Sequence, residues 1–199
     1  LKASADATLA DVITKNTNYN NKVNERITAF SGLKSLSTRL VNALQTTDAT
    51  TETIGNAKTF NRKMQGKKAS SSQTPTDPNT PAPNTISTSQ QSYDHLIQHL
   101  SGLTSVLEAE TSYTPNETDL QVATIQSKIA DLTAKNTAVA TAYTSISNSR
   151  IARNETSYTS TTSLVETALE VKKYVKSVFG ATSPQYAQVK GIEFSKPRL

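Results

Sequence analysis

Residues 125–150 read IQSKIADLTAKNTAVATAYTSISNSR, and this stretch decides the fold class. Its apolar residues recur at alternating steps of four and three, which is the spacing of a buried stripe on a long α-helix. Asn136 falls on this stripe, where a polar side chain needs a partner and can fix the register between helices. Arg150, near its end, is expected either to reach a carboxylate or to leave the core. The pattern predicts a packing seam of Ile125, Ile129, Leu132, Val139, Tyr143 and Ile146.

Similar periodicity on both sides of this stretch predicts further helices. Their approximate ranges are 6–47, 49–65, 87–113, 115–157 for the helix that carries the seam, and 163–179. Gly32 lies inside the first range, where glycine costs up to about 1 kcal/mol relative to alanine. A short turn of helix follows Ser183-Pro184 and ends at Gly191. We expect the seam to pack against Leu96, Leu100, Leu103 and Leu107, together with Val23, Ile27, Leu36 and Leu40.

Several helix ends carry local signals. Thr114-Pro115-Asn116-Glu117 combines a capping threonine, a proline suited to the first helical position and a glutamate that can reach back, so a helix is predicted to begin at Pro115. Ser163 and Glu166 form a second capping box, and Asp48 is the expected cap of the 49–65 helix. Gly66 and Gly180 are natural stops.

These helices predict an all-α fold, namely an up-and-down antiparallel bundle of four to five long helices with a short C-terminal helical turn. Residues 67–86 hold four of the seven prolines of the chain and are expected to form a linker. The domain prediction is a helical hairpin at 1–66, this linker, and a bundle segment at 87–199 that packs with the hairpin as one domain.

Composition narrows the function classes. The chain of 199 residues has no cysteine, which excludes disulfides, zinc–thiolate sites and a cysteine nucleophile. Apolar residues make up only 35%, and no apolar run approaches the ~20 residues that a membrane helix needs. Residues 1–15 contain no apolar segment typical of a signal peptide, so the cellular location is left open between the cytoplasm and the exterior.

Two clusters of basic residues suggest a polyanion such as nucleic acid as an alternative partner. With 21 lysines and arginines against 16 acidic residues, the net charge is +5. One cluster follows the end of the second helix, and both lie near predicted C-termini, where cations also complement the helix dipole. Their members are Lys172, Lys173 and Lys176 beside Tyr174, and Arg62, Lys63, Lys67 and Lys68.

The two histidines, His95 and His99, have the i, i+4 spacing of a two-histidine metal site. The stretch lacks the glutamate of HExxH, and the chain has no Glu-x-x-His pair of a di-iron bundle. We therefore expect both histidines to flank the buried stripe of their helix as solvated or hydrogen-bonded groups. GxSxG, GxGxxG and GxxxxGK[ST] are absent as well, which predicts a non-enzyme without a cofactor.

Four stretches together resemble a known family. They are SQQSYDHLIQHL (89–100), YTPNETDLQVATIQSKIADLTAKN (113–136), SRIARNETSY (149–158) and VKKYVKSVFGATSPQYAQVKGIEF (171–194). In this order they resemble a family of uncharacterised helical proteins from Bacteroidetes. The resemblance implies a helical fold and carries over no activity and no functional residue.

The sequence thus predicts a non-enzymatic structural or scaffolding protein that acts through protein–protein or self-association surfaces. The expected partner is another protein or a second copy of the chain. Binding of nucleic acid or another polyanion through the basic helix ends is the alternative. A metal-binding bundle is the third reading.

Overall fold

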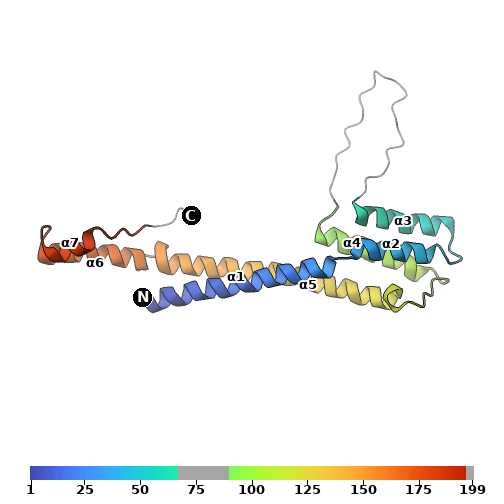
Figure 1. The fold of residues 1–199 in the computed structure, drawn as a ribbon, viewed down its shortest axis with the longest axis horizontal. Coiled ribbons are helices and arrows are strands. Elements are labelled where there is room, and N and C mark those ends of the chain that lie inside the picture. Colours follow the sequence, from blue (N-terminus) through green and yellow to red (C-terminus); the bar gives the residue numbers. More distant parts are fainter. Residues whose placement is uncertain (67–89, 196–199) are drawn as a thin grey trace, which may run out of the picture. The chain divides into compact units, whose positions relative to one another are not determined.

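The computed structural model describes residues 1–66 and 90–195, and all regular structure in these ranges is helical (Figure 1). The chain is an all-α helical bundle, as predicted. The expected linker at 67–86 lies outside the described residues. The helices are α1 (Lys2–Phe30), α2 (Leu33–Leu44), α3 (Thr51–Gln65), α4 (Tyr93–Ala109), the 3₁₀ turn η1 (Thr118–Leu120), α5 (Val122–Asn154), the π-helical turn η2 (Glu155–Thr159), α6 (Leu164–Phe179) and α7 (Pro184–Lys190).

Backbone contacts divide the chain into two compact units. Unit 1 comprises Leu1–Val23 and Val139–Leu199, and unit 2 comprises Asn24–Ala138. The long helices α1 and α5 therefore contribute residues to both units. The division expected from the sequence, with 1–66 and 87–199 packed as one domain, stays a prediction.

The first predicted helix is in fact two helices. α1 ends at Phe30 and α2 begins at Leu33, because Gly32 between them has a φ of 78°. Only glycine adopts this left-handed conformation without steric cost. The break allows Phe30 and Leu33, on either side of it, to reach the same hydrophobic core. The sequence predicted one helix to residue 47, because the apolar spacing is the same on both sides of the break.

In unit 2, α2, α3 and α4 lie side by side (Figure 1). Gln65 on α3 donates to the carbonyl of Lys34, and Ser37 donates to Asn61, so α2 and α3 are antiparallel. Gly102 of α4 contacts the ring of Phe60 on α3. The core between these helices and the first part of α5 is apolar; its fully buried large side chains are Leu33, Leu40, Leu44, Met64, Leu100, Leu103, Leu107, Ile125 and Leu132.

The prediction that a helix begins at Pro115 is wrong. Residues 114–117 form a loop, and α5 begins only at Val122 after the 3₁₀ turn. Tyr113 and Leu120 are both buried, and the Tyr113 hydroxyl donates to the Leu120 carbonyl at 2.9 Å. A helix from Pro115 would carry Leu120 away from Tyr113, so burial of this pair overrides the capping signal.

Other helix ends follow the sequence with small shifts. Thr50, and not Asp48, caps α3 by accepting from the Thr53 amide. α4 covers 93–109 where 87–113 was predicted, and Ser92 caps it. The Ser163 cap, with its hydroxyl accepting from the Glu166 amide, is confirmed, as are the stops at Gly66 and Gly180.

Four of the six predicted seam residues on α5 are buried. Ile125 and Leu132 have no exposed surface, and Val139 and Ile146 are buried. Ile129 is partly buried against the core. Tyr143 is the correction, because it is 58% exposed; its ring lies tilted against that of Tyr19, with ring centroids 6.0 Å apart. Among the predicted partners of the seam, Leu100, Leu103, Leu107 and Leu40 are buried, whereas Ile27 is 52% exposed.

In unit 1, α1 and α5 form an antiparallel pair. Asp11 accepts from the Ser149 hydroxyl at 2.7 Å, and Tyr19 contacts Tyr143, so residue numbers rise on one helix as they fall on the other. The buried side chains between them are few and mostly small, namely Ala5, Val139, Ala142, Ile146 and Ser149.

None of the described helices is both long enough and apolar enough to cross a membrane.

Candidate interaction surfaces

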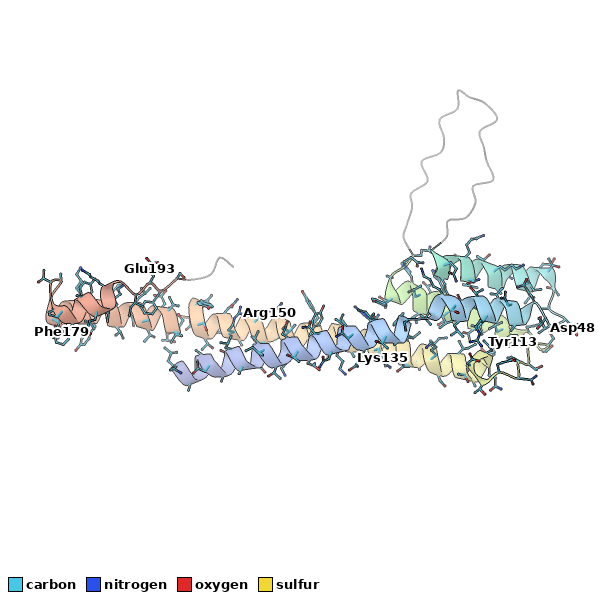
Figure 2. The ribbon with its side chains drawn as sticks, viewed as in Figure 1. Asp48, Tyr113, Lys135, Arg150, Phe179 and Glu193 are labelled. Carbon is cyan, nitrogen blue, oxygen red and sulfur yellow. The ribbon has the colours of Figure 1, made fainter. Side chains whose placement is uncertain are left out.

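One side of α6 is apolar and exposed. Leu164, Val171, Tyr174 and Val178 occupy it, with exposed fractions that rise from 38% at Leu164 to 69% at Tyr174. Their spacing of seven, three and four residues places them in one row along the helix. We call these four residues the α6 stripe. Phe179, at the end of α6 (Figure 2), is 53% exposed beside it.

The rest of α6 is engaged within unit 1. Val165 is buried, and Lys172 Nζ donates to the carbonyl of Ile192 at 2.9 Å. Lys176 Nζ lies 5.9 Å from the ring centroid of Tyr186 on α7. These contacts hold the C-terminal segment against one side of the helix. The α6 stripe is therefore the apolar side of the helix that stays partly exposed.

The lysines of α6 divide into two kinds. Lys172 and Lys176 make the contacts just described, while Lys173 is exposed next to Tyr174. In unit 2, Arg62 and Lys63 lie in the last turn of α3, where they complement the helix dipole. Lys63 also lies 5.9 Å from the ring centroid of Phe60. Lys67 and Lys68 lie outside the described residues.

The two histidines are not both at the surface. Their rings stack with centroids 6.2 Å apart, and His95 Nδ1 lies 3.1 Å from the Ser92 hydroxyl. His99 is 5% exposed, so the expectation that it flanks the buried stripe is wrong. Burial, Lys63 and His95 together lower the pKa of His99. The described residues contain no group of three or more His, Cys, Asp or Glu side chains that could hold a metal.

The polar position on the seam has the partner that the sequence required. Asn136 accepts from an Arg26 guanidinium nitrogen at 3.0 Å and donates to Asp94 at 2.7 Å. The Arg26 guanidinium also lies 4.0 Å from the ring centroid of Tyr93. This network joins α1, α4 and α5 within unit 2. Each of these contacts joins two different helices, so the network holds the three helices together.

A polar hollow of about 460 Å³ lies between the α2–α3 turn and the loop before η1. Asp48 and Tyr113, both labelled in Figure 2, come from the two segments that line it. Burial raises the pKa of Tyr113 to about 12, with smaller contributions from Glu117 and Asp119. The hydroxyl therefore stays protonated and donates to Leu120, which leaves the hollow without a candidate base at this position.

The sequence missed the α6 stripe as a surface. By spacing, Leu164, Val171 and Val178 fit a buried helix face. Tyr174 belongs to the basic cluster that suggests polyanion binding. The sequence did carry one signal for this surface: the apolar residues of α6 cover a wider part of the helix than a single neighbouring helix can bury.

No family model, no curated protein and no solved structure matches the chain.

Proposed function

We propose that this protein is a non-enzymatic helical scaffold that binds another protein through the α6 stripe. The observation that carries the proposal is a heptad-spaced apolar row that stays exposed on a well-capped helix. Such a row is what one helix presents to the groove of another.

The size of the stripe limits what it can bind alone. Complete burial of a large apolar side chain contributes about 1.5–3 kcal/mol, and these four are roughly half exposed, so each adds about 1 kcal/mol. Their sum of about 4 kcal/mol only matches the lower end of the cost of association. A partner must therefore offer a groove that also buries Phe179 or contacts the polar rim.

The test uses neutral substitutions that remove apolar surface without adding charge. A Val171→Asn/Tyr174→Asn double variant should lose the binding of a protein partner that the unchanged chain captures from its source cells and binds again after purification. Replacing Lys172, Lys173 and Lys176 by Gln is the matched control and should leave this binding within a factor of about two. Retained binding in the Asn variant, with far-ultraviolet circular dichroism unchanged, contradicts the proposal.

Polyanion binding is a second candidate, favoured by exposed Lys173 beside exposed Tyr174. It predicts an affinity for duplex DNA that falls steeply with salt and does not depend on the base sequence. The Gln variant should then weaken binding to every duplex alike, whereas the Asn variant should retain most of it. The two variants thus separate the two candidate functions.

A further inference from the structure

Unit 1 has a second exposed apolar surface, on the α1–α5 pair. Leu9 and Ile13 on α1, and Tyr143 and Ile151 on α5, are each between 50% and 62% exposed. We call these four residues the α1–α5 face. It shares no residue with the α6 stripe. Large apolar side chains scattered singly over a surface are ordinary, but a contiguous group marks an interaction site, so their relative placement matters.

Helix geometry places the four residues on one side of the pair. Each residue of an α-helix turns by about 100°. Leu9 and Ile13 lie about 60° and 100° from Val12, which is half-buried toward α5. Tyr143 and Ile151 lie about 60° and 140° from buried Ile146, in the same rotational sense. In an antiparallel pair, the same sense on both helices leads to the same side.

A hydrogen bond verifies this geometry. Turning in the opposite sense leads to Asp11 on α1 and to Ser149 on α5, and these two side chains are joined by a 2.7 Å hydrogen bond. That side of the pair is therefore polar, and the other side is the apolar α1–α5 face. The Asp11–Ser149 and Tyr19–Tyr143 contacts also set the register, in which Leu9 lies level with Ile151.

We propose that the α1–α5 face binds the same face of a second copy of this chain. A two-fold axis parallel to the helices sets α1 of one copy against α5 of the other at the same level. Leu9 then meets Ile151 of the second copy, and Ile13 lies between Ile151 and Tyr143 of the second copy. An isologous contact requires such self-complementarity. The product is a four-helix bundle in which every neighbouring pair of helices is antiparallel.

One charge pair across the contact favours this occupant. Exposed Arg150, labelled on α5 in Figure 2, turns toward the face, and exposed Asp6 lies on the α1 edge of the same side. Asp6 is paired with Lys2 at 2.7 Å, and Lys2 lies on the same side one turn nearer the N-terminus, so the α1 half carries both signs while the α5 half carries Arg150. Packing α1 against α5 of a second copy brings Arg150 toward Asp6 of that copy.

The decisive experiment is light scattering after size exclusion, over a range of concentrations, on the full chain and three variants. The unchanged chain should have twice the chain mass. Ile13→Glu and Ile151→Glu should each shift it to a monomer, because both side chains are exposed and their replacement leaves each copy folded. Asn18→Glu adds the same charge on the polar side of α1 and should remain a dimer.

A charge exchange tests the orientation. Arg150→Asp should weaken the dimer by about tenfold or more, and the Asp6→Arg/Arg150→Asp double variant should restore it. A monomeric unchanged chain overturns the proposal, as does a dimer that survives Ile13→Glu and Ile151→Glu. Loss of the dimer only in the Val171→Asn/Tyr174→Asn variant would overturn it in favour of the α6 stripe. Failure here leaves partner binding by the α6 stripe untouched, because the two surfaces are changed separately.

Discussion

Unit 2 and unit 1 are both built from amphipathic helices, but unit 2 buries the large apolar side chains of its helices more completely than unit 1 does. Among the described residues, all exposed large apolar side chains except Ile27 belong to unit 1. Conversely, within the described part of unit 1, Ile146 is the only large apolar side chain with under 2% exposure, while unit 2 has a continuous core of them. Unit 2 therefore encloses its core, whereas unit 1 leaves apolar side chains exposed.

The number of packed helices explains the difference. In unit 2, α3 contacts α2 on one side and α4 on the other, so its apolar stripe is covered. In unit 1, the α1–α5 pair has a single line of contact, filled largely by alanine and serine. A stripe wider than about 100° stays partly exposed when only one neighbour covers it. Both proposed interaction surfaces thus lie where the fold leaves a helix face partly uncovered.

The largest expected effect is the loss of a core side chain in unit 2. Leu100→Ala removes a side chain with no exposed surface and should lower the free energy of unfolding by about 2–5 kcal/mol. Val171→Ala on the α6 stripe should change it by less than about 0.5 kcal/mol. Urea unfolding, with hydrogen exchange measured separately for α4 and α6, checks both values. Equal effects would remove the contrast between the units.

Two helical glycines of unit 2, Gly55 and Gly102, differ in how much space surrounds them, and this difference tests how tightly α3 and α4 pack. A Cβ at Gly102 would lie 2.3 Å from the Phe60 ring, whereas a Cβ at Gly55 would meet nothing within 4 Å. Gly55→Ala should stabilise α3 by about 0.5–1 kcal/mol through helix propensity. Gly102→Ala should instead destabilise, because overpacking costs about 1–3 kcal/mol and exceeds that gain. Thermal unfolding of the two variants should therefore shift in opposite directions.

The smallest expected effect is a pH dependence confined to unit 2. Burial lowers the pKa of His99 below its usual 6.5, so the unfolded state binds more protons than the folded state just below that pH. The stability that neutral His99 provides is therefore full above about pH 6.5 and is lost as the pH falls through the folded pKa. The urea midpoint should rise as the pH increases toward about 6.5 and then level off. His99→Leu should flatten this rise, and His95→Gln should keep it.

Local sequence signals predicted those features that depend on a few neighbouring residues. Ser163 caps α6 and Gly180 ends it because an N-cap hydroxyl and a positive-φ glycine act within one helical turn. The same signals failed at Pro115 and at Gly32. At Pro115, burial of Tyr113 with Leu120 outweighs a capping box. At Gly32, the backbone turns between two helices whose apolar spacing is continuous.

The candidate surfaces were less predictable than the helices. Periodicity identifies the apolar residues of a helix but not whether a neighbour covers them. Tyr143 fits the seam spacing as well as Ile146 does, yet one is 58% exposed and the other is buried. Asn136 was identified as needing a partner, but Arg26 and Asp94 could not be named, since they lie 110 and 42 residues away along the chain.

The sequence by itself determined an all-α chain, the approximate positions of most helices and a seam with one polar position. It could do so because helix formation follows from apolar spacing and from caps within a few residues. Only the tertiary structure decided which apolar faces are covered, because coverage depends on helices that are distant in the chain. That decision separates the closed core around Leu100 from the exposed row at Val171 and the exposed face at Ile13.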